Sequence, residues 1–134
     1  MKILKFGLLA PGLALLLAAC GGGTAGNGGG GGGGGCTQKG AASGATAAQT
    51  VKINSDPNTI GRYDPQNLTV KVGDSVEWDW IDTSAQHSVT ADDGTFESCL
   101  QSSGSKFIVT FSSAGDFKYH CQIHSGMTGD IKVG

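Results

Sequence analysis

Short runs in which apolar and polar residues alternate fill most of the chain from Thr50 to its end. Because successive side chains of a β-strand point to opposite faces, each run predicts a strand with one buried face. Gly-Asp and Ser-Ala-Gly sequences, which are typical of turns, separate the runs. The sequence therefore predicts an all-β fold, either a sandwich or a barrel. The apolar positions of the runs are Val51 and Ile53; Leu68, Val70 and Val72; Val76, Trp78 and Trp80; Phe107, Val109 and Phe111; Phe117 and Tyr119; and Ile131 and Val133.

Length and aromatic content bound this fold further. A chain of 134 residues is expected to hold one domain. Its last roughly 85 residues can bury a core of modest size. Aromatic side chains should supply most of the apolar area of that core. The aromatic residues expected in the core are Trp78, Trp80, Phe107, Phe111, Phe117 and Tyr119.

Residues 1–19 are typical of a secretory leader, with basic residues at Lys2 and Lys5, an apolar centre and small residues at the end. The segment is too short for a comfortable membrane span. Its last three residues and the following Cys20 form a Leu-Ala-Ala-Cys sequence that resembles a bacterial lipobox. This predicts cleavage before Cys20 and a lipid on its sulfur, which would anchor the protein to a bacterial membrane facing the periplasm or the cell exterior. An ordinary signal peptide cut near the same alanines is the alternative.

Glycine dominates residues 21–35, where no core can form because glycine has no side chain to bury. We expect residues 20–46 to comprise the lipidated cysteine and a flexible linker that spans about 25–30 Å as a coil. The folded domain is then expected over residues 47–134.

The charge pattern narrows the range of partners. Removal of the leader takes two lysines and leaves seven basic residues against eleven acidic ones, so the net charge of the mature chain is near −4. The chain has no basic cluster, and we therefore expect no binding to nucleic acid. A partner steered by charge should present a positive face.

Residues 121–127 combine three soft metal donors at short spacing. Cys121, His124 and Met127 offer a thiolate, an imidazole and a thioether directly after the alternating segment that ends at His120. This donor set suits copper, whereas zinc sites rarely use methionine and calcium or magnesium prefer oxygen. A site with two histidines, one cysteine and a distant methionine needs a second histidine. His87 is the only candidate outside the loop and the neighbouring His120.

Strand parity separates His120 from the ligands. In the predicted strand, Phe117, Tyr119 and Cys121 share one face, and Lys118 and His120 share the other. The aromatic face should be the buried one, because the opposite face carries a lysine. Cys121 is therefore predicted to point inward, and His120 is predicted to be exposed and not a ligand.

With these motifs the chain resembles the cupredoxins, the small type 1 (blue) copper proteins, and above all the plastocyanin and amicyanin group. The resemblance covers residues 50–134. It rests on Tyr63-Asp-Pro65 leading into the run that ends at Trp78, on His87-Ser-Val-Thr with a following Asp-Gly, and on the Cys-x2-His-x2-Met loop. Many family members have Pro before the first histidine and Asn after it, where this chain has Gln86 and Ser88. The exchange leaves the ligand set intact.

The resemblance implies a Greek-key β-sandwich that holds one copper ion through His87, Cys121, His124 and Met127. It implies that the backbone N–H of Ser88 donates toward the sulfur of Cys121, and that the electron leaves through the exposed edge of His124. The small or apolar residues around that edge would suit brief docking of a redox partner protein. We therefore expect a monomeric, membrane-tethered electron carrier that is not an enzyme.

The four cysteines divide into three roles. Cys20 is assigned to lipid and Cys121 to metal, which leaves Cys36 and Cys99. In an exported protein this even remainder favours a disulfide. The bond would close a long loop and stabilise the fold by about 4 kcal/mol in chain-entropy models. Two unrelated thiols are the alternative.

Three rival functions fit the residues less well. The pair His120-Cys121 resembles half of the bridge between the two coppers of the nitrite reductases, but one remaining histidine cannot build a catalytic site without another subunit. Copper storage or delivery proteins commonly use Met-rich or Cys-x-x-Cys segments, and the mature chain has one methionine. A structural zinc site could use His87, Cys121 and His124, but it would not call for Met127.

Overall fold

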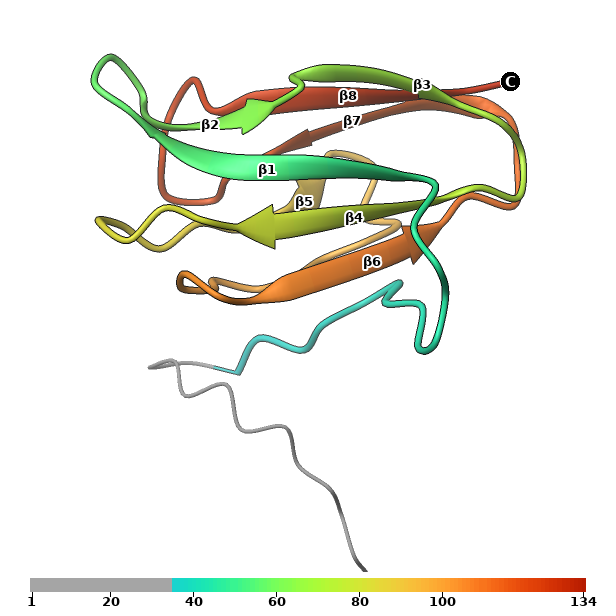
Figure 1. Ribbon diagram of the computed structural model, residues 1–134, viewed down its shortest axis with the longest axis horizontal. Coiled ribbons are helices and arrows are strands. Elements are labelled where there is room, and N and C mark those ends of the chain that lie inside the picture. The colour runs from blue at the N-terminus through green and yellow to red at the C-terminus, as the bar shows by residue number, and fades with distance from the viewer. Residues whose placement is uncertain (1–34) are drawn as a thin grey trace, which may run out of the picture.

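The computed structural model describes residues 35–134 (Figure 1). The predictions of a leader, of a lipid on Cys20 and of a glycine linker up to residue 34 lie outside these residues. In the described part of the chain, no helix has the length and apolar character needed to cross a membrane.

Eight strands form two facing sheets. The strands are β1 (Gln49–Asp56), β2 (Ile60–Asp64), β3 (Asn67–Val70), β4 (Ser75–Trp80), β5 (Thr90–Ala91), β6 (Lys106–Thr110), β7 (Gly115–His120) and β8 (Thr128–Val133). One sheet has the order β2-β1-β4-β6 and the other β3-β8-β7-β5 (Figure 1). Neighbouring strands are antiparallel except for the parallel pairs β1 with β4 and β3 with β8. The chain crosses between the sheets after β2, β3, β4, β5 and β6, as Greek-key sandwiches do. The prediction of an all-β sandwich is confirmed.

Alternation along the strands fills the space between the sheets. In β4, Trp78 and Trp80 are buried, whereas Glu77 and Asp79 are partly exposed. Tyr119 reaches Trp78 from β7 of the other sheet, and the two rings meet edge to face with centroids 5.4 Å apart. Such aromatic pairs contribute stability beyond the area that they bury. Of the aromatic residues predicted to form the core, Phe117 is partly buried and the others, Trp78, Trp80, Phe107, Phe111 and Tyr119, are fully buried.

The fold includes residues that precede the predicted boundary at residue 47. Lys39 and Glu97 exchange two backbone hydrogen bonds of 2.8 and 3.0 Å, and the N–H of Ala42 donates to the carbonyl of Ile108 in β6 at 2.7 Å. Residue 39 thus pairs with the segment between β5 and β6, and residue 42 pairs with the edge of β6 that faces away from β4 (Figure 1). The expected linker, which runs to residue 46, therefore includes residues that are attached to the domain by backbone hydrogen bonds and not by buried apolar side chains.

A disulfide joins Cys36 to Cys99. Their Cα atoms are 5.9 Å apart, which lies within the usual range of about 4.4–6.8 Å. The bond connects positions 63 residues apart in the sequence. It therefore attaches the start of the described chain to the loop that precedes β6.

Replacing Cys36 and Cys99 together by serine should lower the free energy of unfolding by about 2–4 kcal/mol, because the unfolded chain gains the freedom of an open loop. Urea denaturation followed by tryptophan fluorescence measures this difference. Reduction of the wild-type disulfide should produce a similar loss. Equal unfolding free energies for the oxidised wild type and the double variant would contradict the prediction.

Candidate metal centre

The loop of residues 121–127 connects β7 to β8 and is closed by its own backbone. The N–H of Cys121 donates to the carbonyl of Met127 at 3.0 Å, and the N–H of Met127 donates to the carbonyl of His124 at 3.2 Å. Gly126 has φ of +87°, a conformation that glycine adopts far more easily than other residues. These features give the loop a fixed shape that directs its donors toward the end of the sandwich.

His87 approaches this loop from the segment between β4 and β5. Its backbone exchanges two hydrogen bonds with Gln101, of 2.9 and 3.1 Å, and its carbonyl also accepts a hydrogen bond from the indole N–H of Trp80 at 2.9 Å. The position of His87 is therefore set by groups that do not belong to the loop.

The donor atoms of His87, Cys121 and His124 converge at this end of the sandwich. Nδ1 of His87 lies 3.0 Å from Nδ1 of His124, which in turn lies 3.5 Å from Sγ of Cys121. All three atoms lie within 4.8 Å of one another. Because metal–nitrogen and metal–sulfur bonds measure about 2.0–2.3 Å, one ion can contact all three.

The sulfur of Met127 lies close to the ring of His87. Met127 is 2% exposed. A Cβ atom added to Gly61 of β2 would lie 2.2 Å from Cε1 of His87 and 2.9 Å from Sδ of Met127. Both side chains thus use the space that a larger residue at position 61 would fill. Gly61 is therefore needed for the site, although no sequence motif draws attention to it.

Ser88 connects the two sides of the site. Its backbone N–H lies 3.4 Å from Sγ of Cys121, the contact that the resemblance to the cupredoxins implies. Its hydroxyl accepts a hydrogen bond from the N–H of Gln122 at 2.9 Å. The N–H of Ser88 can therefore stabilise negative charge on the sulfur.

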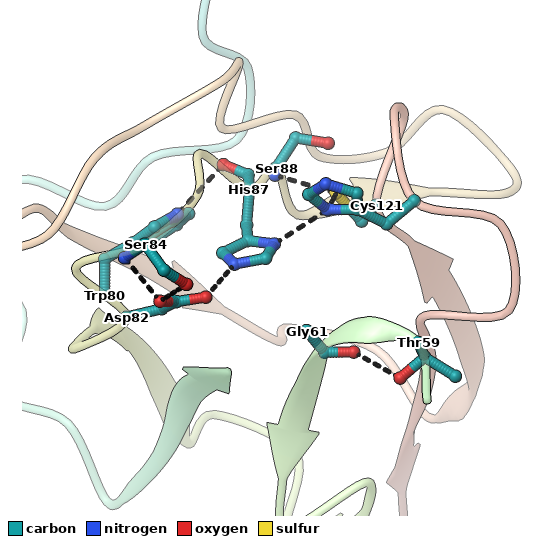
Figure 2. Close-up of polar contacts among 9 residues, drawn as sticks. Thr59, Gly61, Trp80, Asp82, Ser84, His87, Ser88 and Cys121 are labelled. Carbon is teal, nitrogen blue, oxygen red and sulfur yellow. Dashed lines mark hydrogen bonds and ion pairs between the residues drawn. The ribbon is translucent and has the colours of Figure 1, made fainter. Parts of the chain in front are cut away.

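Asp82 is a further contact of the site, which the sequence motifs do not predict. Its Oδ2 lies 2.8 Å from Nε2 of His87, on the side of the ring opposite the other donors (Figure 2). The Asp82 and His87 side chains are 1% and 0% exposed. The ring of His87 therefore lies between the carboxylate of Asp82 and the other two donors, Cys121 and His124.

His120 lies outside the cluster of His87, Cys121 and His124. Its side chain is 43% exposed, and its Nδ1 lies 2.6 Å from Oδ1 of Asp92. Cys121, one residue further on, is buried. The structure thus agrees with the strand parity, which directs Cys121 inward and His120 outward.

Hydrogen bonds favour the thiolate form of Cys121. Burial works to raise the pKa of this thiol, but the neighbouring imidazole of His87 and the backbone N–H groups of Ser88 and the loop lower it from 9.0 to about 6. Burial likewise works to lower the pKa of His87, but the thiolate of Cys121 and the carboxylate of Asp82 outweigh it and raise the pKa. At neutral pH the sulfur is therefore in the form that binds metal.

This donor set fits copper. Two imidazole nitrogens and one thiolate, with a thioether nearby, are soft ligands of the kind that copper accepts in both of its oxidation states. Calcium or magnesium would need oxygen donors, and none of the three clustered side chains offers one.

Comparison with known proteins identifies the family. Residues 49–134 match the model of the copper binding proteins of the plastocyanin/azurin family. The chain belongs to this family of cupredoxins. The cofactor of the family is copper, as the donor set predicts, and His87, Cys121 and His124 form a candidate type 1 site.

Several known proteins align with about two thirds or more of this cupredoxin chain. The plastocyanin of Nostoc punctiforme is 28% identical over an alignment of 108 residues, and the match covers 68% of this chain and 77% of that protein. A reduced Cu(I) form of an amicyanin mutant is 28% identical, with a TM-score of 0.56 over 73% of this chain and 92% of that chain. The copper-containing nitrite reductase NirK from Thermus scotoductus is 26% identical, with a TM-score of 0.54 over 69% of this chain but 24% of the reductase chain. The sandwich is therefore the cupredoxin fold.

In the metal-free protein, the thiol of Cys121 should titrate with a midpoint near pH 6 instead of 9. The ultraviolet absorbance of the thiolate measures this midpoint, taken as the difference between the wild type and Cys121→Ser. Because the folded pKa lies below the unfolded value, the thiolate stabilises the fold fully above pH 9, and this contribution is lost as the pH falls through about 6. A midpoint near 9 would show that the hydrogen bonds do not hold the thiolate.

Proposed function

We propose that this cupredoxin carries single electrons through one type 1 copper ion, while a lipid on Cys20 holds it at a bacterial membrane. The observation that carries the electron-transfer function is the buried convergence of two imidazole nitrogens and one thiolate. Membership of the copper-binding plastocyanin/azurin family supports the same function. The Leu-Ala-Ala-Cys sequence that ends at Cys20 supports the lipid anchor.

The proposed ligands are His87, Cys121, His124 and Met127. The first comes from the segment after β4, and the other three come from one loop. The sandwich therefore sets the distance between the two groups of ligands. The thioether of Met127, buried beside His87, would supply the weak fourth ligand of a type 1 site.

Bound copper supplies a one-electron couple between its two oxidation states. The residues of the chain supply a fixed frame, because backbone hydrogen bonds hold Cys121 within its loop and His87 against Gln101. A frame that changes little between the two states favours fast electron exchange. The N–H of Ser88 stabilises negative charge on the sulfur, which weakens its donation to the metal and moves the reduction potential.

The loop end of the sandwich offers a place for a redox partner protein. His124 is partly exposed, and the adjacent Ile123 is 52% exposed. Ile60 and Ile81, also exposed, lie in segments that turn at the same end (Figure 1). Exposed apolar side chains at the same end as a partly exposed ligand suit a brief encounter, because electron-transfer complexes bury little area.

A catalytic role has less support. This chain matches 24% of the NirK chain, and the remaining histidine, His120, pairs with Asp92. Within residues 35–134, the second cluster of potential metal ligands is Cys36, Glu97 and Cys99, of which the two cysteines form a disulfide. Copper storage or delivery without electron transfer is the second candidate function, because the same donors would also bind copper in a storage protein.

Copper(II) added to the full-length protein should produce an intense blue absorption band and narrow copper hyperfine splitting in electron paramagnetic resonance. Cys121→Ser should abolish the band, because the band arises from charge transfer from the sulfur. Met127→Leu should keep the band and shift the reduction potential. His120→Ala serves as the control and should change neither. A colourless complex would favour storage or zinc binding, and a second copper signal would favour an enzyme.

Cys20→Ser should move the protein from the membrane fraction to the soluble fraction, because the sulfur that accepts the lipid is lost. Labelling with a radioactive fatty acid should mark the wild type and not the variant. Thr24→Ala, a change in the same segment, should leave both results as in the wild type. Membrane retention and labelling of Cys20→Ser would rule out the lipid anchor at this residue.

A further inference from the structure

Asp82 is unusual because it is a buried carboxylate. Its side chain is 1% exposed, and it is the only acidic residue among the buried polar residues of the described chain. Moving a carboxylate out of water is costly unless hydrogen bonds or opposite charges compensate. The groups that compensate Asp82 therefore indicate its role.

One oxygen of Asp82 is fixed by its own turn. Oδ1 accepts hydrogen bonds from the backbone N–H of Ser84 at 2.7 Å and from the Ser84 hydroxyl at 2.6 Å (Figure 2). Two hydrogen-bond donors on one oxygen favour the ionised form of the carboxyl group and hold it in one position.

The other oxygen selects the tautomer of His87. An ionised carboxylate can only accept a hydrogen bond, so the proton of the 2.8 Å contact must sit on Nε2. Nδ1 of the neutral ring then keeps its lone pair. That atom is the one that lies 3.0 Å from Nδ1 of His124, within the three-donor cluster. The contact with Asp82 thus leaves the metal-facing nitrogen free to bind.

No full positive charge neutralises Asp82. Among the described residues, no lysine or arginine forms an ion pair with it, and its side-chain oxygens contact the donors of Ser84 and the ring of His87. The imidazole therefore separates the negative charge from the metal position. A negative charge in this place makes His87 a stronger donor and favours the more highly charged state of a bound metal.

We propose that Asp82 is a positioning residue of the metal centre, which holds His87 as the Nε2–H tautomer and whose charge favours copper(II) over copper(I). The effect on the tautomer concerns the chain alone, whereas the effect on the oxidation state rests on the proposed copper function. A neutral acceptor would be sufficient for the first effect. The second requires an anion, and this separates the proposal from a purely structural role.

Asp82→Asn in the full-length, metal-free protein tests the tautomer. The amide oxygen is expected to keep the two donors of Ser84, so that the NH2 group faces Nε2 and shifts the proton of His87 to Nδ1. Nitrogen-15 NMR of the ring, at a pH where His87 is neutral, should show the proton on Nε2 in the wild type and substantially on Nδ1 in the variant. The same tautomer in both proteins would overturn the positioning role.

The copper-loaded protein tests the charge. In Asp82→Asn the ratio of copper(II) affinity to copper(I) affinity should fall about tenfold, which corresponds to a rise of about 59 mV in the reduction potential. Asp92→Asn is the matched control, because it also neutralises a carboxylate that contacts a histidine, but that pair is exposed and outside the cluster. The control should change neither the tautomer of His87 nor the potential. Equal shifts of the potential in the two variants would overturn the charge effect.

Two further variants keep the test decisive if Asp82→Asn does not fold. Asp82→Ser is smaller and neutral, and it should release the tautomer and raise the potential in the same directions. Ser84→Ala removes the 2.6 Å hydroxyl contact but keeps the charge, so its potential should stay near that of the wild type. A shift in Ser84→Ala as large as that in Asp82→Ser would assign the effect to the turn and overturn the proposal.

If the wild type binds no copper, the proposed function fails, and the NMR measurement still decides the tautomer.

Discussion

Two independent sets of backbone hydrogen bonds hold the imidazole of His87 and the loop of residues 121–127 against each other, and the candidate metal centre depends on this arrangement. Gln101 and Trp80 fix His87, whereas Met127 closes the loop around Cys121. The two anchors share no residue, and Ser88 connects them through its contacts with Cys121 and Gln122. A small β-sandwich can therefore keep donors from distant parts of the sequence within reach of one another.

The strands that were predictable share one property, the repeated inward placement of apolar side chains. β1, β4 and β6 each have at least two such residues, so their alternation is visible in the sequence. β2 has only Tyr63 as a buried apolar side chain, and β5 is two residues long, so neither produces a pattern. Residues 39–42 are held by backbone hydrogen bonds to other segments, and such bonds do not require a particular type of side chain that the sequence would reveal. Alternation thus predicts the strands with several buried apolar residues, but not β2, β5 or the segment of residues 39–42.

Some residues of the candidate site could likewise be predicted from the sequence, and others could not. Cys121 and His124 follow from the spacing and parity of a single loop, and His87 follows because few histidines remain. Asp82 and Gly61 could not be predicted in this way, because their roles depend on how distant segments approach each other. An aspartate two residues before a serine is common in solvent-exposed turns, and only the packing around His87 makes this one a buried carboxylate. A glycine in a strand likewise has no evident function until the ring and the sulfur that it accommodates are known.

The disulfide between Cys36 and Cys99 also has a mechanical consequence. Cys99 lies two residues before Gln101, whose backbone pairs with His87. A pulling force applied to the chain ahead of Cys36 would pass through this covalent link into the body of the sandwich close to the metal-binding end. The hydrogen bonds of Lys39 with Glu97 and of Ala42 with Ile108 would carry little of that load, so the segment of residues 39–42 would stay attached under tension.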